Sequence, residues 1–237
     1  MGIKEKAKAW RDRLQHLIYK IIDPIVHGMI RLGLTPNIVT TIGFVGNVAG
    51  AALLVYAGTI DGRPMFEVIG LTGVLLLFSS LFDMMDGQVA RIGQMASTFG
   101  AMYDSILDRY SEMATMGGVC FCLIQHDYMA GAVITFVALV GSVMVSYVRA
   151  RAEGLGLECK VGMMQRPERV VITCVALIAC GIAGCSRESI PFDPMLILIV
   201  PMAFIAIFAN ITAIVRILYS RRQLTEARRD KPTNAEQ

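Results

Sequence analysis

Four aspartates in a short stretch of the chain carry the strongest chemical signal in the sequence. Asp83 and Asp86 are three residues apart, and Asp104 and Asp108 are four apart, so each pair falls on one face of a helix. Four carboxylates that face one another repel strongly unless cations lie between them. Oxygen ligands without His or Cys are those that magnesium and manganese prefer. The spacing therefore predicts a divalent-metal site on two neighbouring helices.

The residues around the aspartates indicate what such a site would bind. Two divalent ions in a carboxylate cluster are typical of sites that bind a diphosphate and neutralise charge on a leaving phosphate. Gly87 and Gly100 leave room either for close helix packing or for a ligand that reaches the backbone. Arg91 lies on the same side and can pair with a phosphate. The alternative is that the aspartates are helix-end carboxylates in water, paired with Arg91 and Arg109.

The elements that must position these residues are strongly apolar. The chain has 237 residues, a mean hydropathy of +0.58 and 17% charged residues, whereas charged residues make up about a quarter of soluble domains. We therefore expect an all-α integral membrane protein. Charges at membrane depth are costly and usually have a function, which strengthens the interpretation of the aspartates. Residues 1–35 are rich in Lys and Arg and do not resemble a cleavable signal peptide.

Six apolar stretches reach the length of about 20 residues that a membrane crossing needs. The second and third qualify only if the aspartates are tolerated at one end. Basic residues gather before the first stretch, between the fourth and fifth, and after the sixth, which places both termini and the aspartates on the cytoplasmic side of the inner membrane. The expected spans cover residues 38–58, 66–89, 98–123, 129–149, 168–185 and 192–217.

The sequence predicts three parts along the chain. Residues 1–35 form an N-terminal juxtamembrane amphipathic helix, because apolar residues recur there at helical spacing between basic ones. Pro36 disfavours helix at the residue before it and suits the first turn of the next helix. Residues 36–220 then form the six-helix transmembrane catalytic domain, and residues 221–237 form a polar C-terminal tail.

The spacing around the aspartates resembles the signature of a known family, the CDP-alcohol phosphotransferases or CDP-alcohol phosphatidyltransferases. The chain agrees with that signature at every fixed position. The resemblance implies six transmembrane helices after an interfacial helix, a homodimer, and a site for two Mg²⁺ or Mn²⁺ ions that opens to the cytoplasm. The residues that carry the resemblance are Asp83, Asp86, Gly87, Ala90, Arg91, Gly100, Asp104 and Asp108.

The same resemblance implies roles for individual residues. Asp83 and Asp104 would bridge both metal ions, Asp86 would bind one and Asp108 would contact the other. Asp108 would also be the catalytic residue, as the general base that takes the proton from the acceptor hydroxyl. For Asn37, a helix cap is an alternative to a ligand contact. The residues that would bind the CDP group are Asn37, Thr40, Gly87, Arg91, Ser97 and Gly100.

A second stretch, residues 146–157 followed by residues 165–169, resembles the prokaryotic phosphatidylinositol phosphate synthases, which use inositol phosphate as acceptor. A dianionic acceptor needs several cations, and Arg suits phosphate oxygens. The alternative is that these arginines set the topology or contact anionic lipid headgroups. Glu112 departs from this branch, which tends to have Asp there. The acceptor pocket that the resemblance implies consists of Ser146, Arg149, Arg166, Arg169 and Arg216.

The sequence thus predicts an enzyme of phospholipid synthesis. It would transfer a phosphatidyl group from CDP-diacylglycerol to the hydroxyl of inositol phosphate and release CMP. The expected partners are CDP-diacylglycerol, a small phosphorylated acceptor and membrane lipids, with no nucleic acid. One alternative is the same chemistry with glycerol phosphate, free inositol or serine as acceptor. Another is a metal-coupled transporter, since acidic residues inside membranes also mark ion pathways, although paired helix breaks in two halves of the chain are not evident.

Overall fold

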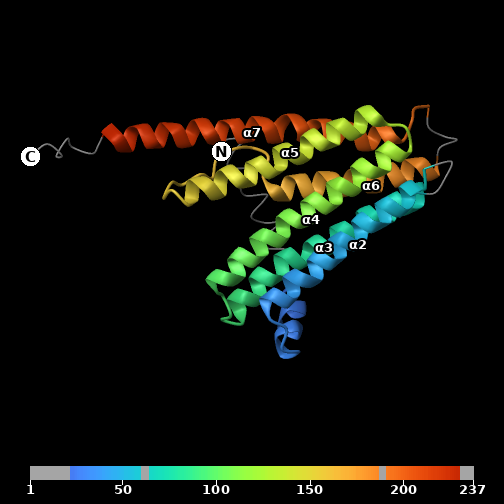
Figure 1. Cartoon of the computed structure of the whole chain (residues 1–237). Coiled ribbons are helices and arrows are strands. Elements are labelled where there is room, and N and C mark those ends of the chain that lie inside the picture. Colours follow the sequence, from blue (N-terminus) through green and yellow to red (C-terminus); the bar gives the residue numbers. More distant parts are fainter. Residues whose placement is uncertain (1–21, 60–63, 187–190, 230–237) are drawn as a thin grey trace, which may run out of the picture. The chain divides into compact units, whose positions relative to one another are not determined.

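The structure of the chain is a computed structural model that describes residues 22–59, 64–186 and 191–229 (Figure 1). Within these ranges the chain is built from helices and turns, and they contain no strand. Residues 22–31 are helical. The longer helices that follow are α2 (Pro36–Thr59), α3 (Phe66–Ile92), α4 (Thr98–Gln125), α5 (Met129–Glu153), α6 (Arg166–Cys185) and α7 (Met195–Arg229).

Five of the described helices are long and apolar enough to cross a membrane, namely α2, α3, α5, α6 and the Met195–Glu226 part of α7. This confirms the prediction of an all-helical, multi-pass membrane protein. The third expected span, over residues 98–123, is not among them. The reason is that α4 carries Asp104, Asp108, Arg109 and Glu112 within its first fifteen residues, which lowers its hydropathy.

The last helix extends further than the apolar pattern indicates. The sequence predicts a span over residues 192–217, whereas α7 begins at Met195 and continues to Arg229. The N–H of Met195 donates to Asp193 Oδ1 at 3.0 Å, which satisfies a free backbone group at the start of the helix. Beyond the apolar part, Arg222 and Glu226 form an ion pair of 2.8 Å one turn apart, a contact that supports helix in water.

The break before the first membrane helix lies where the sequence predicts it. Gly33 has a φ of +75°, and the N–H of Leu34 donates to the Met29 carbonyl oxygen at 3.0 Å. This left-handed ending suits glycine, which has no side chain to clash. Pro36 is then the first residue of α2. The expected interfacial helix over residues 1–35 lies partly outside the described residues, which begin at residue 22.

The chain divides into two compact units, and each is described by itself. The first contains the described residues up to Gly46 together with Phe78–Tyr110. Its small apolar core consists of Ile22, Val26, Val39, Met85 and Val89. The helix over residues 22–31 therefore packs against the start of α2 and the end of α3, the helix that carries Asp83 and Asp86.

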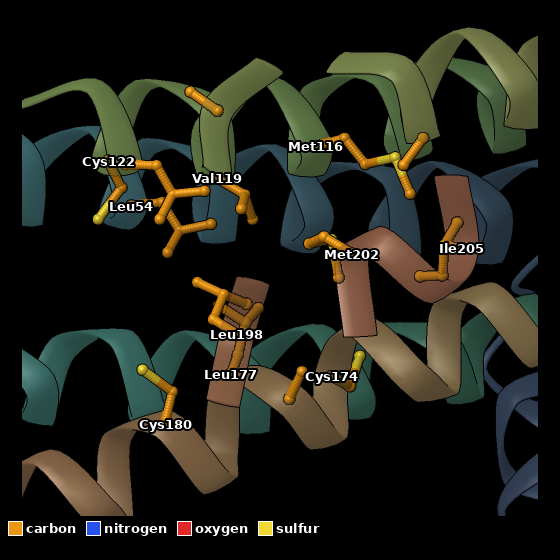
Figure 2. Close-up of a cluster of buried hydrophobic side chains, with 14 of the residues drawn as sticks. Leu54, Met116, Val119, Cys122, Cys174, Leu177, Cys180, Leu198, Met202 and Ile205 are labelled. Atoms are coloured by element: carbon orange, nitrogen blue, oxygen red, sulfur yellow. The ribbon is translucent and has the colours of Figure 1, made fainter. Parts of the chain in front are cut away.

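The second unit contains Asn47–Leu77 and the described residues from Ser111 onward. Its larger core joins parts of several helices (Figure 2). Two glycines allow α3 and α6 to approach closely, since a Cβ atom on Gly70 would lie 3.2 Å from the Cα atom of Gly181. Core side chains that are fully or almost fully buried include Leu54, Met116, Val119, Cys122, Leu177, Cys180, Leu198, Met202 and Ile205.

Candidate active site

The first unit brings the two aspartate pairs onto consecutive helices. Asp83 and Asp86 lie in the C-terminal part of α3, and Asp104 and Asp108 lie in the first turns of α4. A tight turn over residues 93–97 joins the helices, with Gln94 at a φ of 52°. The Met95 N–H donates to the Ala90 carbonyl oxygen at 2.9 Å and closes the end of α3.

A cavity of about 220 Å³ lies between the start of α2, the end of α3 and the start of α4. It gathers most of the residues that the sequence predicts for CDP and metal binding. Asp83, Arg91 and Asp108 do not line it. The predicted residues that do are Asn37, Thr40, Asp86, Gly87, Ser97, Gly100 and Asp104.

Asp86 is the most buried of the four aspartates, with 6% of its surface exposed. The Thr40 hydroxyl lies 2.6 Å from its Oδ2 atom and 3.0 Å from the Pro36 carbonyl oxygen, so its single proton has two acceptors in reach. Asp104 and Asp83 are near enough to repel the Asp86 carboxylate. A buried carboxylate beside two like charges is costly unless a cation compensates them. The surroundings of Asp86 therefore suit a bound cation.

The glycines of the cavity have separate effects. A Cβ atom on Gly87 would meet nothing within 4 Å, so this position is open and helix packing does not explain it. A Cβ atom on Gly100 would lie 3.0 Å from Ser97 Oγ and 3.2 Å from Asn37 Oδ1. Gly100 therefore allows the polar ends of Asn37 and Ser97 to come close at the cavity wall.

Ser97 and Asn37 occupy defined positions at helix starts. The Ser97 Oγ accepts the Gly100 backbone N–H at 3.0 Å, which makes Ser97 the N-cap of α4. Asn37 lies inside the first turn of α2, after Pro36, and the Thr35 carbonyl accepts the first N–H groups of that helix. This placement favours a ligand contact for Asn37 over a capping role.

Gly43 is a residue of this unit that the sequence analysis missed. A Cβ atom there would lie 3.1 Å from Asp83 Oδ1 and 3.3 Å from the Ser79 carbonyl oxygen. The missing side chain makes room for Asp83 between α2 and α3. Small residues three apart, Gly43 and Gly46, are the signal that points to this close approach.

Arg91 and the remaining aspartates lie apart from the cavity lining. The Arg91 Nε donates to the Gly87 carbonyl oxygen at 3.2 Å on an exposed helix surface, and Asp83 and Asp108 are half-buried. In the described ranges, no three His, Cys, Asp or Glu side chains come close enough together to hold a metal ion. Carboxylate oxygens, with neither His nor Cys among them, are nonetheless the kind of ligand that Mg²⁺ and Mn²⁺ prefer. Metal binding by all four aspartates stays a prediction.

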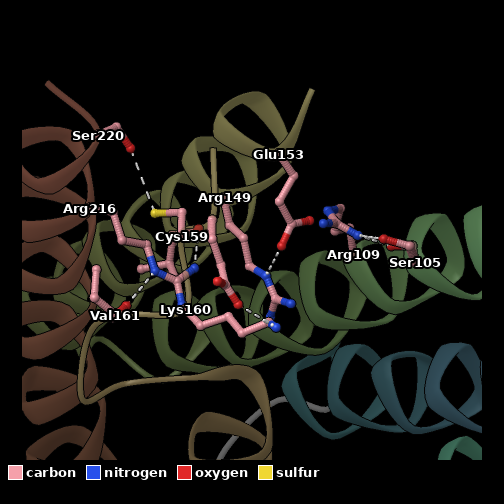
Figure 3. A network of polar contacts seen from close by, with 11 residues as sticks. Ser105, Arg109, Arg149, Glu153, Cys159, Lys160, Val161, Arg216 and Ser220 are labelled. Carbon is pink, nitrogen blue, oxygen red and sulfur yellow. Dashed lines mark hydrogen bonds and ion pairs between the residues drawn. The ribbon is translucent and has the colours of Figure 1, made fainter. Parts of the chain in front are cut away.

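In the second unit, the predicted acceptor residues fall into two groups. Arg149 Nε lies 2.8 Å from Glu153 Oε1, and these two side chains are 41% and 45% exposed. Arg216 is buried, and it donates to the Val161 carbonyl oxygen at 2.8 Å and to the Val145 carbonyl oxygen at 2.7 Å. Figure 3 shows these contacts around the segment between α5 and α6.

Arg169 forms the most buried ion pair among the described residues. Its Nε lies 2.6 Å from Glu112 Oε1 and its Nη2 lies 2.8 Å from Glu112 Oε2, with side chains 1% and 6% exposed. Its Nη1 donates to the Met164 carbonyl oxygen at 3.2 Å. The sequence analysis did not identify Glu112 as this partner. The only signal was a carboxylate one turn after Asp108, at a position where the related branch tends to have Asp.

Arg169 and Arg216 are thus buried and donate to oxygens of the protein itself. Ser146, Arg149 and Arg166 are partly exposed. Arg166 is the first residue of α6, and the proline after it suits a first helical turn. The segment before α6 also depends on Gly162, whose φ is +110° and whose missing side chain accommodates Thr212. A shared acceptor pocket for all five residues stays a prediction.

Together, the fold and the site define a class: a multi-pass helical membrane protein with a cavity lined by Asp86, Asp104, hydroxyl side chains and glycines. The sequence matches the CDP-alcohol phosphatidyltransferase family over residues 33–215. The chain belongs to this family, whose members are phosphotransferases that use divalent metal ions. The family resemblance that the aspartate spacing carries is confirmed.

Relatives support the assignment over most of the chain. A phosphatidylinositol phosphate synthase of Mycobacterium bovis is 35% identical over 199 residues, which cover 84% of this chain and 84% of that protein. One of Streptomyces avermitilis is 33% identical over 219 residues, covering 92% of this chain and 84% of that protein. These relatives carry the name of the branch that the segments around residues 146–157 and 165–169 resemble.

Solved structures give the same result for the fold. A crystal structure of Mycobacterium tuberculosis phosphatidylinositol phosphate synthase with CDP-DAG bound matches with a TM-score of 0.71 and 32% identity, covering 85% of this chain and 94% of that one. A second, in complex with manganese and citrate, matches with a TM-score of 0.70 and 30% identity, covering 90% of this chain and 91% of that one.

Proposed function

We propose that this enzyme transfers the phosphatidyl group of CDP-diacylglycerol to a hydroxyl of inositol phosphate and releases CMP. The observation that carries this proposal is the single cavity in which Thr40, Asp86, Gly87, Ser97 and Asp104 meet. Further support comes from the relatives, which are phosphatidylinositol phosphate synthases, and from the CDP-DAG bound to one of them.

In this proposal, Asp83, Asp86, Asp104 and Asp108 hold two Mg²⁺ or Mn²⁺ ions. When bound, the ions supply positive charge that polarises the diphosphate and stabilises the leaving phosphate. Thr40 keeps the Asp86 carboxylate in position through its hydrogen bond of 2.6 Å. The manganese in a related structure supports this choice of metal.

The CDP group is bound by residues at the helix starts and by the turn between α3 and α4. The side chain of Asn37 and the hydroxyls of Thr40 and Ser97 offer hydrogen-bond partners to cytidine and ribose. Gly87 and Gly100 allow the ligand to approach the backbone, and the space beside Gly87 contains no protein atom within 4 Å of a Cβ position. Arg91 supplies a guanidinium for a phosphate oxygen.

Asp108 is the proposed general base. Its carboxylate accepts the proton of the acceptor hydroxyl, and the acceptor oxygen forms a new bond to the phosphorus that carries the diacylglycerol. The P–O bond to the CMP phosphate breaks, and CMP leaves with the electron pair of that bond. Holding both substrates in position supplies much of the remaining acceleration.

For the acceptor, we assign the phosphate contacts to Ser146, Arg149 and Arg166. Their partial exposure and the fork geometry of arginine support this assignment. Arg169 and Arg216 complete the set that the sequence predicts. Their bonds to Glu112 and to backbone carbonyl oxygens support a role in fixing the segment before α6.

The proposal includes a topology. We assign α4 as a further span that brings the total to six, residues 1–35 as an interfacial helix, and both termini and the active site to the cytoplasmic side of the inner membrane. The basic residues that flank the apolar stretches support this orientation. We also expect a homodimer, as the family resemblance implies.

The test is an acceptor panel. Purified enzyme receives CDP-diacylglycerol and Mg²⁺ or Mn²⁺ with inositol phosphate, glycerol phosphate, free inositol or serine, and the lipid product is identified by mass. We expect a phosphatidylinositol phosphate product and CMP only with inositol phosphate. A product with a different acceptor would contradict the acceptor assignment, and CMP release in any arm would reject the transporter alternative.

A further inference from the structure

A groove on the second unit shares no residue with the sites described above. It has a volume of about 670 Å³ and runs between the C-terminal end of α5 and the later part of α7. Most of its lining is apolar, and two arginines, Arg151 and Arg221, are part of it. Neither arginine has a role in the proposed reaction.

The groove occupies helix faces other than those of the predicted acceptor residues. Tyr147, Arg151 and Leu155 follow one another at intervals of four residues, so they lie on one face of α5 and of the turn that continues it. Ser146 and Arg149 do not share this spacing and lie on the opposite face. The groove is therefore a separate candidate site, not part of the acceptor set.

The same distinction holds on α7. Ile217, Arg221 and Leu224 are spaced by four and three residues and line the groove together. Arg216 belongs to another face, where it is buried against backbone carbonyl oxygens. The two helices thus present one groove whose lining is mostly apolar, with Arg151 and Arg221 as its two charged side chains.

The two arginines of the groove differ from the arginines near them in the sequence, which form ion pairs with glutamates. Arg149 is bonded to Glu153, and Arg222 is bonded to Glu226, each at 2.8 Å. Arg151 and Arg221 are exposed, and no carboxylate within the described ranges forms an ion pair with either of them. Their positive charges are therefore available to an anionic ligand.

The apolar lining of the groove is accessible as well. Tyr147, Leu155, Ile217 and Leu224 are between 43% and 58% exposed. They lie where the apolar parts of two candidate membrane spans give way to basic residues, at the depth at which arginines reach phosphate headgroups and apolar side chains contact acyl chains.

We propose that this groove binds one anionic membrane phospholipid. Its phosphate pairs with Arg151 and Arg221, and an acyl chain lies along Tyr147, Ile217 and Leu224. Charge complementarity favours a lipid over a second copy of the chain, because a twofold contact through this face would bring the same unpaired arginines together. A lipid also explains why exposed apolar residues and guanidinium groups share one groove.

The test measures lipid binding without substrates. The purified full-length protein in detergent is titrated with dioleoyl phosphatidylglycerol or dioleoyl phosphatidylcholine and followed by native mass spectrometry. The test variant is Arg151→Gln with Arg221→Gln, and the matched control is Arg222→Gln, whose side chain is exposed and paired with Glu226. We expect one tightly held phosphatidylglycerol, an affinity about tenfold weaker in the double variant, and no change in the control.

Several outcomes would overturn the inference. Three results would contradict a groove that is specific for an anionic headgroup. They are equal affinity for the two lipids, an equal loss of affinity in the Arg222→Gln control, and lipid binding without a saturable first site. Competition by millimolar inorganic phosphate would identify a free-anion site instead, and a dimer lost in the double variant with lipid binding unchanged would identify a protein interface. Arg151→Lys with Arg221→Lys should fold and retain binding, and its failure to bind would contradict a role for the charges.

Discussion

Buried charge is arranged in opposite ways in two regions of the molecule. One is the donor cavity of the first unit, lined by Asp86 and Asp104. The other is the arginine segment of the second unit, which consists of residues 146–169 together with Arg216. In the cavity, Asp86 is 6% exposed and lies beside two other carboxylates, with a hydroxyl as its nearest side-chain donor. In the arginine segment, Arg169 is 1% exposed and has both oxygens of Glu112 and a backbone carbonyl oxygen as partners. Asp86 therefore has like charges beside it, whereas the charge of Arg169 is neutralised by a carboxylate.

This difference indicates how the two regions contribute to function. A buried carboxylate with like charges beside it is stabilised by a cation, so it suits a site that binds a charged ligand. A neutralised pair fixes the chain and leaves little charge for a ligand. The arginines that remain partly exposed, Arg149 and Arg166, are therefore better suited to bind a substrate than Arg169 and Arg216.

The largest effect is expected from removing a charge of the cavity region. Asp83→Asn or Asp104→Asn should lower kcat by about 10³-fold or more, because the stabilisation that a metal ion supplies amounts to several kcal/mol. Activity and its dependence on Mn²⁺ concentration should disappear together. The measurement is CMP release across a Mn²⁺ titration, and wild-type metal dependence in either variant would contradict the metal-site assignment.

A slightly smaller effect is expected for the proposed base. Asp108→Asn should lower kcat by about 10²- to 10⁴-fold, the usual contribution of general base catalysis, while the affinity for CDP-diacylglycerol stays within a factor of about two to three. Turnover and equilibrium binding of the CDP-lipid are measured on the same preparation. Full activity would remove the base assignment, whereas loss of lipid binding would give Asp108 a role in the donor site instead.

In the arginine segment, we expect a substitution to lower the stability of the fold before it lowers the catalytic rate. Glu112→Gln leaves the buried Arg169 guanidinium without its charged partner, and we expect the free energy of unfolding to fall by about 3–5 kcal/mol. Thermal unfolding in detergent checks this. Replacing both residues, Glu112→Leu with Arg169→Met, should recover most of the loss, and a double variant as unstable as the single one would contradict a mainly pairwise role.

The exposed arginine should show a smaller and more specific effect. Arg149→Ala should raise the KM for the phosphorylated acceptor about tenfold, the loss expected for one charged hydrogen bond, and leave CDP-diacylglycerol binding intact. Lys160→Ala is the matched control, because Lys160 is 67% exposed and paired with Glu158. An equal effect in both variants would mean that Arg149 acts only through the general positive charge of the surface, which would contradict a specific contact with the acceptor.

The smallest effect is expected for the hydroxyl beside Asp86. Thr40→Val keeps the shape of the side chain and removes the hydrogen bond of 2.6 Å to the carboxylate, so kcat should fall about fivefold to tenfold. Thr41→Val is the control, since that hydroxyl contacts the Asn37 carbonyl oxygen and Tyr103 instead. The same fall in the control would show that the α2 surface, not the carboxylate contact, accounts for the loss.

The fold was predictable where local chemistry decides it. Pro36 marks the start of α2, as the sequence predicts, and apolar stretches identify the membrane helices. The length of α7 was not predictable in this way, because its last turns are polar and are stabilised by contacts such as Arg222 with Glu226. The sequence predicted a span over residues 98–123, which matches the position of α4, but the charged residues of this helix keep it out of the set of clearly apolar spans.

The candidate site was predictable to a different degree in its two regions. The cavity residues are near one another in sequence or at helix starts, so the spacing of Asp86, Gly87 and Gly100 was informative. The contact of Glu112 with Arg169 joins helices far apart in the sequence, and the approach of Gly43 to Asp83 depends on how two helices pack. The sequence holds only weak signals for such tertiary contacts, namely the spacing of Gly43 and Gly46 and the carboxylate one turn after Asp108.

The most direct test of the central claim is anomalous diffraction from crystals of the protein soaked in Mn²⁺. We predict anomalous peaks within coordination distance of Asp83, Asp86, Asp104 and Asp108, two in number, that vanish in the Asp104→Asn variant. Carboxylates that point away from one another in a crystal saturated with Mn²⁺, with no peak among them, would contradict the proposal that this cluster binds the metal ions of the transferase.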